Sequence, residues 1–135
     1  MDFLSRYLKE RPVNSHKGTF GSLKLLCGSK RYTGAALLCC EGALRSGCGL
    51  VKLFADENVI LPVRIRLPEV INGPAVDFKN INADAAVIGC GISDEYENEL
   101  AQIIESIDCP CVIDADGINF IAKHINILRK ANSRL

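Results

Sequence analysis

Short apolar segments, each closed by a turn-forming residue, recur along the chain. The segments 22–27, 50–55, 85–88 and 111–113 consist mainly of Leu, Val, Ile, Ala and Cys, and each stops at a glycine or an aspartate. Apolar runs of this length between turn residues are typical of strands that are covered on both faces. We therefore predict four buried strands.

Helical patterns alternate with these strands. The segment 35–46 contains small and apolar residues without β-branching, which favours a helix that Gly47 ends. The segment 93–107 repeats leucine and isoleucine at helical spacing, and Ser93 is its predicted N-cap residue. Strands and helices in alternation predict an α/β protein with a mainly parallel sheet.

Less regular segments lie at the two ends and in the middle of the chain. The segments 1–11 and 118–128 predict a short charged helix and an apolar helix, respectively. Asp56 begins a short helix that Pro62 is expected to end, because a proline inside a helix removes a backbone hydrogen bond. The segment 72–74, with the sequence NGP, predicts a turn.

The turns after three of the strands carry the candidate chemistry, because ligands of open α/β sheets bind at the carboxyl ends of strands. After the first strand, Gly34 lets a ligand approach the backbone. The turn at Gly89 and Gly91 is either an anion or nucleotide site or a tight strand-to-helix turn. Strand alternation places Asp114 and Asp116 on one side, where they suit substrate hydroxyls, hydrated magnesium or the start of the next helix.

Two common phosphate-binding motifs are absent from the sequence. No Gly-Lys-Ser/Thr follows Gly28 at the distance that a Walker A loop requires. Gly47 and Gly49 close a helix and enter a strand, which reverses the order of a dinucleotide-binding fingerprint. Lys17, in a polar turn with two glycines, is either a solvated side chain or a cation near a phosphate.

The composition narrows the class of protein. The 135 residues suffice for one domain with a hydrophobic core, and 16 basic against 16 acidic residues give no basic surface for nucleic acid. No apolar run reaches the ~18 residues that span a bilayer, and the charged start of the chain is unlike a signal peptide. We expect a soluble cytoplasmic protein that binds neither nucleic acid nor membrane.

The seven cysteines are expected to be buried free thiols, because most of them lie in or beside apolar runs. No metal site is predicted from their spacing. Cys109 and Cys111 are separated by one residue instead of two, no second pair mirrors them, and the chain has two histidines.

The chain resembles one known family from about residue 11 to its last residue. The likeness rests on six segments in order: HKGTFGSLKLLCGS, YTGAALL, ALRSGCGLV, LPEVI, AAVIGCGIS and CVIDADGIN. Together they resemble the carbohydrate-kinase-like domain of NAD(P)H-hydrate dehydratase. The resemblance implies a ribokinase-like three-layer fold, of which residues 1–135 would form the N-terminal half as a partial domain. It also implies a lyase that repairs hydrated NADH and NADPH, with ADP or ATP as phosphate donor, Mg²⁺ as cofactor and a homo-oligomeric, commonly tetrameric, state.

The same resemblance implies substrate-binding residues. Gly34 and Ala35 lie in the YTGAA loop, which resembles the family's substrate-contacting loop. Gly89 and Gly91 match the two glycines of the family's Gly-Pro-Gly turn, in which Cys90 replaces the proline. The DADGIN segment adds three residues near the substrate: Asp114, Asp116 and Asn119.

Lys17 falls in the family's His-Lys-Gly motif and is the candidate nucleotide contact.

The sequence also departs from the family's pattern. The family's catalytic aspartate and phosphate-binding glycines belong to a late Gly-Asp motif that these 135 residues do not contain. We therefore assign no catalytic residue and expect the chain by itself to be inactive. An open sheet edge and an exposed apolar face predict aggregation, or a partner that supplies the other half.

Two alternatives stay open beside the dehydratase. The first is a fragment of another ribokinase-like small-molecule kinase, such as one that acts on a vitamin-precursor alcohol. The order of the HKG, YTGAA and LPE segments argues against it. The second is a non-catalytic module that binds nucleotide or assembles with a homologue, and binding of NAD(P)H-like ligands without turnover would favour it.

Overall fold

A computed structural model describes residues 11–131, so most of the helix predicted over 1–11 lies outside the described residues. The strands are β1 (Ser22–Leu26), β2 (Leu50–Ala55), β3 (Ile71–Pro74), β4 (Ala85–Ile88) and β5 (Cys111–Ile113). The α-helices are α2 (Thr33–Arg45), α3 (Glu57–Arg66), α4 (Glu97–Ser106) and α5 (Asp116–Lys123). Three 3₁₀ helices, η1 (Lys17–Phe20), η2 (Ala75–Asn80) and η3 (Ile125–Arg129), complete the described elements.

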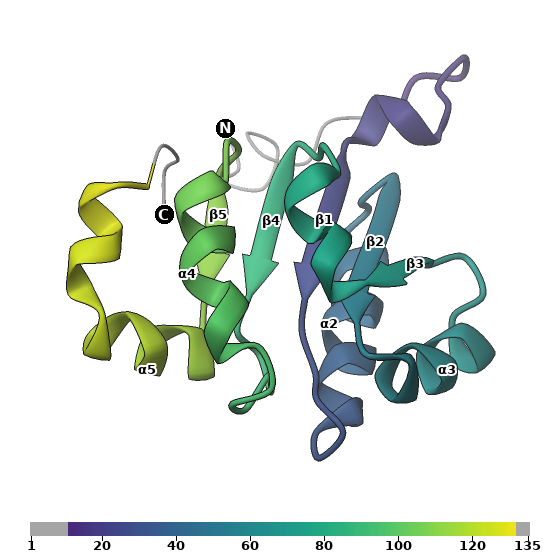
Figure 1. The fold of residues 1–135 in the computed structure, drawn as a ribbon. Helices are drawn as coiled ribbons and strands as arrows, with labels where there is room; N and C mark the ends of the chain where they lie inside the picture. The colour runs from purple at the N-terminus through teal and green to yellow at the C-terminus, as the bar shows by residue number, and fades with distance from the viewer. Residues whose placement is uncertain (1–10, 132–135) are drawn as a thin grey trace, which may run out of the picture.

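The strands form one parallel sheet in the order β3-β2-β1-β4-β5 (Figure 1). Leu25 of β1 is in register with Leu53 of β2 and with Val87 of β4. From β1 the chain proceeds through α2 and α3 toward one edge, whereas from β4 it proceeds through α4 toward the other edge. The direction of winding therefore reverses between β1 and β4. In open α/β sheets, such a switch point is where ligands bind, at the carboxyl ends of the strands.

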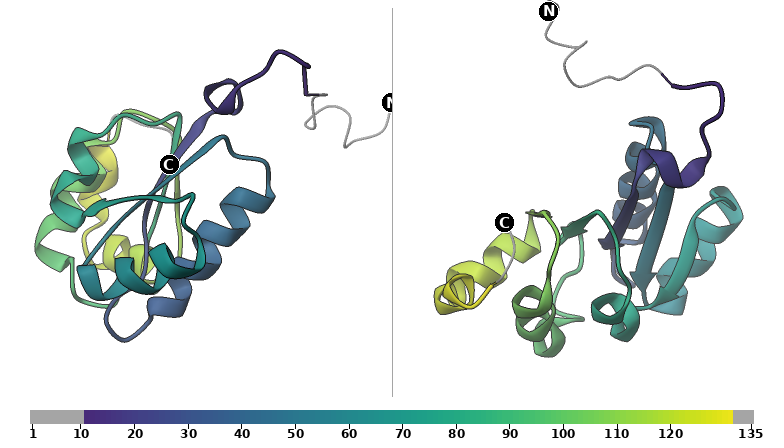
Figure 2. Two further views of the ribbon diagram at one scale, coloured as in Figure 1. Left: turned by 90° about the vertical axis from the view of Figure 1, so that its right-hand side faces the viewer. Right: turned by 90° about the horizontal axis from the view of Figure 1, so that it is seen from above.

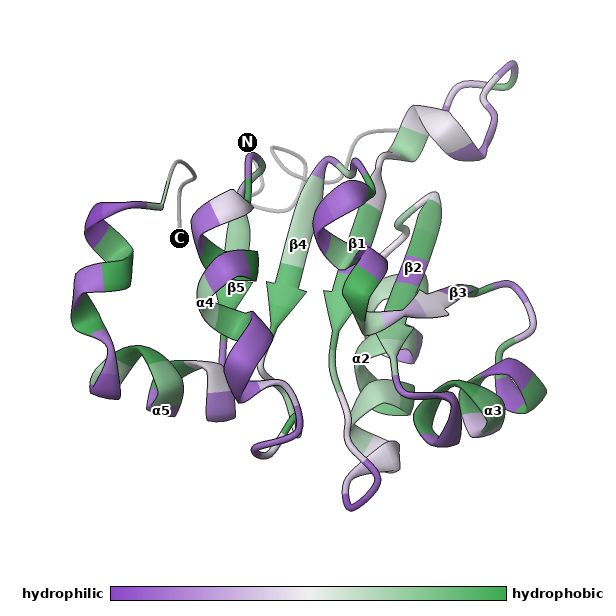
Figure 3. Cartoon of the chain, in the orientation of Figure 1, coloured by the Kyte–Doolittle hydropathy of each residue, from purple (hydrophilic) through white to green (hydrophobic). Residues whose placement is uncertain are grey.

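Each face of the sheet has its own hydrophobic core, because side chains alternate along a strand. On one face, residues such as Leu25 and Leu53 pack with buried residues of α2 and α3. On the other, residues such as Leu26 and Ile88 pack with buried residues of α4 and with Phe78 of η2. Helices consequently cover both faces, as Figure 2 shows, and the strands are more apolar than the outer helix surfaces in Figure 3. This layering confirms the predicted α/β class.

Two predictions for the middle of the chain are wrong. Pro62 does not end α3, which continues to Arg66. Side chains that are buried on both sides of the proline, including Val59 and Val63, hold the helix on the core. The segment 72–74 is not a turn but belongs to β3, which pairs with β2 at the edge of the sheet. An edge strand tolerates its proline because one of its sides needs no hydrogen-bond donors.

The last two helices also differ from their predictions. The helix α4 begins at Glu97 instead of Ser93, which has a positive φ of 54°. The predicted apolar helix over 118–128 is two pieces, α5 and η3, separated by His124 in a non-helical conformation. A residue beyond the helix decides the start of α4, because the Ser93 backbone N–H donates to the side chain of Asp116, at 2.9 Å.

Candidate functional site

The sequence-predicted glycine loops meet at the switch point, at the carboxyl ends of β1 and β4. The Gly28 N–H, directly after β1, donates to the carbonyl of Cys90 in the turn after β4, at 2.8 Å. Gly28 has a φ of 80°, and a Cβ there would lie 2.7 Å from the Cβ of Ala36 in α2. Only a glycine brings β1, the start of α2 and the β4 turn this close together.

The turn at Gly89 and Gly91 is wedged between two other predicted segments. Gly91 has a φ of 66°, and a Cβ on it would lie 2.6 Å from the Cβ of Ala35. Gly89 has a φ of 118°, and a Cβ on it would collide with the carbonyl of Asp114. Gly89 is therefore required by close backbone-to-backbone packing, and Gly91 by its close approach to the Cβ atoms of Ala35 and Tyr32. By contrast, Gly34 has no heavy atom within 4 Å of its Cβ position, so its surface is open to a ligand.

The two aspartates of the DADGIN segment face different partners. The Asp116 Oδ2 atom accepts the Ser93 N–H, whereas the Asp114 Oδ2 atom lies 3.7 Å from the Cys90 Sγ atom. Ala115 between them has φ 49° and ψ −118°, which ends the extended backbone. Because β5 ends at Ile113, strand alternation does not set the directions of these two side chains, although both contact the turn that follows β4. Asp116 is the first residue of α5, which confirms that it begins the next helix.

A cleft between α4 and α5, called here the α4–α5 cleft, contains two of the predicted site residues. Its volume is about 300 Å³. It is lined by Ser93, Asp94, Glu97, Leu100, Asp116, Asn119, Phe120 and Lys123. Three carboxylates against one ammonium group give this cleft an acidic lining. Such a lining suits sugar hydroxyls or a hydrated divalent cation better than an unaccompanied phosphate group.

A larger cleft, at the carboxyl ends of β2 and β3, was not predicted from the sequence. This β2–β3 cleft has a volume of about 560 Å³. Its lining includes Asp56, Glu57, Arg64, Asn72, Glu95, Tyr96 and Glu99. The sequence does not reveal the residues of β3 in this lining, because the NGP segment predicts a turn. A short polar strand at a sheet edge has no hydrophobic alternation that would reveal it.

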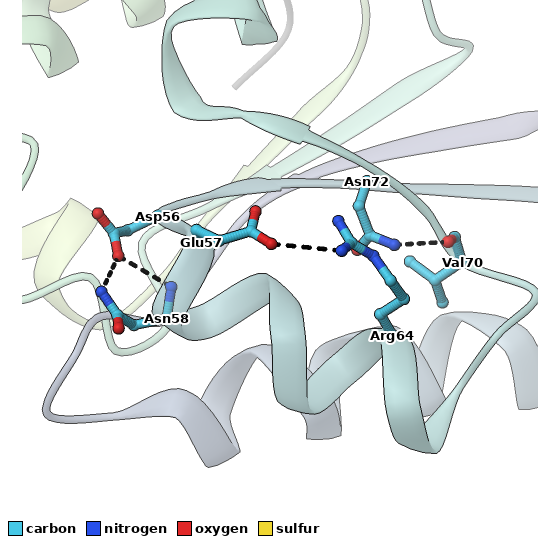
Figure 4. Close-up of polar contacts among 6 residues, drawn as sticks. All are labelled: Asp56, Glu57, Asn58, Arg64, Val70 and Asn72. Carbon is cyan, nitrogen blue, oxygen red and sulfur yellow. Dashed lines mark hydrogen bonds and ion pairs between the residues drawn. The ribbon is translucent and has the colours of Figure 1, made fainter.

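Figure 4 shows how the polar groups of the β2–β3 cleft are held. The Asp56 carboxylate accepts the Asn58 N–H at 3.0 Å and so caps α3, and this bond lowers the pKa of Asp56. Arg64 pairs with Glu57 at 3.3 Å. The Asn72 Nδ2 atom donates to the Val70 carbonyl at 2.8 Å, which leaves the buried Oδ1 atom without a partner among the described residues.

Lys17 lies away from all of these groups. It belongs to η1, the purple segment before β1 in Figure 1, so it is at the amino ends of the strands. The two clefts are lined by residues at the carboxyl ends. The His16 side chain accepts the Gly18 N–H at 3.2 Å and caps η1. A Cβ on Gly49 would collide with the Lys17 carbonyl, so η1 packs closely on the start of β2. Within one chain, the structure does not bring Lys17 to the other predicted residues.

Three cysteines that the sequence pattern did not connect also meet at the switch point. The Sγ atoms of Cys27, Cys39 and Cys90 lie within 4.8 Å of one another. Hydrogen bonding with the Cys27 thiol lowers the pKa of Cys39 to about 6, although partial burial opposes this shift. In contrast, burial raises the pKa of Cys40, the next residue in α2, to about 12. The seven cysteines are all free thiols, as predicted, and four of them are buried.

The sheet order and the switch-point site define the class of the protein, which has a ribokinase-like fold. A crystal structure of a ribokinase-like superfamily protein from Enterococcus faecalis matches 86% of this chain with a TM-score of 0.78 and 26% identity. The chain belongs to the NAD(P)H-hydrate dehydratase family, a family of enzymes, because the model of that family matches residues 23–135.

Two named relatives show the extent of the similarity. The ADP/ATP-dependent NAD(P)H-hydrate dehydratase from Bacillus subtilis, crystallised with ATP and Mg²⁺, is 36% identical, with a TM-score of 0.72 over 82% of this chain. A bifunctional NAD(P)H-hydrate repair enzyme from Gloeobacter violaceus is 33% identical over 87% of this chain. The chain covers 44% of the E. faecalis protein, 42% of the B. subtilis protein and 25% of the G. violaceus protein. It therefore spans less than half the length of each.

Within residues 11–131, no helix is both long and apolar enough to cross a bilayer.

Proposed function

We propose that this chain supplies the substrate-side part of the site of an NAD(P)H-hydrate dehydratase that uses ADP or ATP as phosphate donor. The observation that carries the proposal is the convergence of the three predicted loops at the switch point. The open backbone at Gly34 lies at the start of α2. The next residue, Ala35, contacts Gly91 in the turn after β4. The family membership and the B. subtilis relative support the choice of substrate and donor.

The proposed roles follow from the position and chemistry of each group. Gly34 and Ala35, with Gly89 and Gly91, present backbone without bulky side chains, against which a flat nicotinamide ring can lie. Asp116 and Asn119 line the α4–α5 cleft and offer hydrogen-bond acceptors to the substrate's hydroxyl groups. Asp114 lies next to them in the chain, directly after β5, and completes the proposed substrate-binding set.

The reaction itself requires groups that this sequence does not contain. In the proposed reaction, the nucleotide phosphorylates the hydroxyl group of the hydrated ring, and phosphate leaves as the ring double bond re-forms. Phosphoryl transfer depends on a base and on donors arranged around the moving charge. The carboxylates of the α4–α5 cleft would accept hydrogen bonds from waters bound to the nucleotide's Mg²⁺, and the ion would neutralise part of the phosphate charge. No glycine-rich phosphate loop is present in the 135 residues.

Binding and turnover can be tested separately. We expect the 135-residue polypeptide to bind hydrated NADPH, measured by calorimetry, and to show no ADP-dependent conversion of it. Asp116→Asn keeps an acceptor for the Ser93 N–H but removes the charge, and Asn119→Ala removes the amide. Each substitution is expected to weaken binding about tenfold, which corresponds to the loss of one hydrogen bond to a polar or charged group.

The matched control is Asp77→Asn, the same chemical change on the exposed surface of η2, which should leave the affinity unchanged. If the polypeptide does not bind hydrated NADPH, or if Asp77→Asn weakens binding as much as Asp116→Asn, the proposed site is wrong. Measurable turnover would show that the phosphate-binding segment is not required. Binding of NAD(P)H-like ligands by a protein that stays inactive when the rest of the family's domain is supplied would favour the non-catalytic module.

Lys17 belongs to a second part of the proposal, in which the active protein is a cytoplasmic homo-oligomer. Because Lys17 lies at the amino ends of the strands, it can reach a nucleotide at the carboxyl ends only from a second copy. Lys17→Ala should then weaken ADP binding to the oligomer and leave the binding of hydrated NADPH to a monomer unchanged. Equal affinity of the oligomers of both variants for ADP would remove Lys17 from the site.

A further inference from the structure

The trio of thiols at the switch point has a geometry that the dehydratase reaction does not use. Its members come from three different elements. Cys27 directly follows β1, Cys39 is in the middle of α2, and Cys90 is the central residue of the turn after β4. The three Sγ atoms nevertheless lie within 4.8 Å of one another. Their spacing of 11 and 50 intervening residues resembles no short metal-binding motif, so the sequence alone does not reveal it.

The backbone holds the three thiols together before any ligand binds. The Gly28 N–H bonds to the Cys90 carbonyl at 2.8 Å, which fixes the residue after Cys27 to the β4 turn. The close contact of Gly28 with Ala36 fixes the same residue to α2, one turn before Cys39. The Cys27 side chain is fully buried, whereas Cys39 and Cys90 are partly exposed. A ligand can therefore enter from the side of Cys39 and Cys90 and meet Cys27 at the bottom of the site.

We propose that Cys27, Cys39 and Cys90 bind one thiophilic metal ion, with Zn²⁺ as the first candidate. Three thiolates are a soft ligand set, which selects Zn²⁺ or Cu(I) over Mg²⁺ or Ca²⁺. Tetrahedral Zn²⁺ with bonds of about 2.3 Å places sulfur atoms about 3.8 Å apart. The observed limit of 4.8 Å is within about 1 Å of that value, a difference that small side-chain rotations of the two partly exposed cysteines accommodate.

Asp114 provides a carboxylate for the fourth position of such a site. Its Oδ2 atom lies 3.7 Å from the Cys90 Sγ atom. A carboxylate is an accepted fourth ligand of Zn²⁺, and it can also accept a hydrogen bond from a metal-bound water. This arrangement places the metal beside the Gly89–Gly91 turn, where it would fix the conformation of the proposed substrate-binding turn. The three cysteine ligands do not depend on the proposed function, because neither substrate nor nucleotide takes part in binding the metal, whereas Asp114 is shared with the proposed substrate-binding set.

The test is titration of the reduced 135-residue polypeptide with Co²⁺, a spectroscopic substitute for Zn²⁺, under anaerobic conditions with a phosphine reductant. We expect sulfur-to-cobalt charge-transfer absorption that saturates at one Co²⁺ per chain and disappears when Zn²⁺ is added. Zn²⁺ should also raise the melting temperature, because it binds the folded chain. Cys39→Ala and Cys90→Ala should each weaken Co²⁺ binding by about 100-fold or more.

Cys48→Ala is the matched control, since Cys48 is also a partly exposed free thiol but does not belong to the trio. Its Co²⁺ spectrum and affinity should equal those of the unchanged chain. Circular dichroism of each variant verifies that the fold is retained. The proposal is overturned if the unchanged chain shows no charge-transfer band, or if Cys39→Ala and Cys90→Ala keep it. A disulfide between two of the three cysteines that persists in the reductant and prevents Co²⁺ binding would also overturn it. If the chain retains Cu(I) in preference to Zn²⁺, the choice of Zn²⁺ as the bound ion is wrong.

Discussion

At the scale of single residues, the glycines of the site fall into two groups. Gly28, Gly89 and Gly91 have positive φ and face backbone or side-chain atoms that leave no room for a Cβ. Gly34 is at the start of a helix and faces open space. The sequence shows the same residue type in both groups, and only the contacts show which glycines hold the loops together and which one leaves a surface open.

A pair of substitutions tests this difference. Gly89→Ala should lower the free energy of unfolding by about 2 kcal/mol or more, because a Cβ would collide with the Asp114 carbonyl at a φ of 118°. Gly34→Ala is the control and should be neutral or raise it by up to about 1 kcal/mol, since alanine restricts the unfolded chain. Urea denaturation measures both. Equal effects of the two substitutions would contradict the assignment.

At the scale of elements, helix boundaries depend on contacts that lie outside the helix. Pro62 remains inside α3 because buried side chains on both sides hold the helix on the sheet. Ser93 does not cap α4, because its backbone N–H is bonded to Asp116, from a different part of the chain. The propensity of a residue is smaller than the free energy of burying several side chains, so packing prevails where the two conflict.

The proline in α3 leads to a stability prediction. Pro62 is an exposed residue in the interior of α3, and Pro62→Ala supplies the backbone N–H that proline lacks. Alanine also increases the conformational entropy of the unfolded chain, which offsets part of the gain. We expect the free energy of unfolding to rise by about 1–2 kcal/mol, measured by thermal and urea denaturation. Pro68→Ala, outside the helix, is the control and should not stabilise the chain. A loss of stability in Pro62→Ala would show that the proline positions α3.

At the scale of the whole molecule, the two wings of the sheet meet along β1 and β4. Asp84, the residue before β4, links the two strands at their amino ends by hydrogen bonds to Ser22, the first residue of β1. Its Oδ2 atom accepts the Ser22 N–H at 2.7 Å and the Ser22 hydroxyl at 2.9 Å. These hydrogen bonds to the ionised form, the backbone bond first, lower the pKa of Asp84 from its ordinary value of 3.8. The carboxylate therefore links the β3-β2-β1 wing to the β4-β5 wing.

This linkage predicts a dependence of stability on pH. Since the folded-state pKa of Asp84 is lowered, its contribution is present above pH 3.8 and is lost as the pH falls through the lowered value. Asp84→Asn should lower the melting temperature at neutral pH, and the difference from the unchanged chain should shrink as the pH decreases below 3.8. Asp77→Asn, whose carboxylate is exposed on η2, serves as the control. A difference that stays constant with pH would rule out this role for the charge.

The strands and the class of fold could be predicted from the sequence because their signal is local. Buried parallel strands are short, continuous apolar runs, so β1, β2, β4 and β5 stand out. The short edge strand β3 is polar and contains a proline, and it was predicted as a turn. The α4–α5 cleft contains the predicted residues Asp116 and Asn119, whereas the β2–β3 cleft was missed together with its strand.

The sequence by itself determined the alternation of strands and helices, the glycine turns after the strands and the family to which these motifs belong, since each of these is encoded by neighbouring residues. Only the tertiary structure decided which side chains meet. The sheet order places β1 beside β4, although 58 residues of the chain lie between the end of β1 at Leu26 and the start of β4 at Ala85. That adjacency, with α2 packed beside it, brings Cys27, Cys39 and Cys90 together, whereas Lys17 stays at the amino ends of the strands because η1 precedes β1. Contacts between distant segments depend on how the whole sheet buries its two faces, and no local pattern records them.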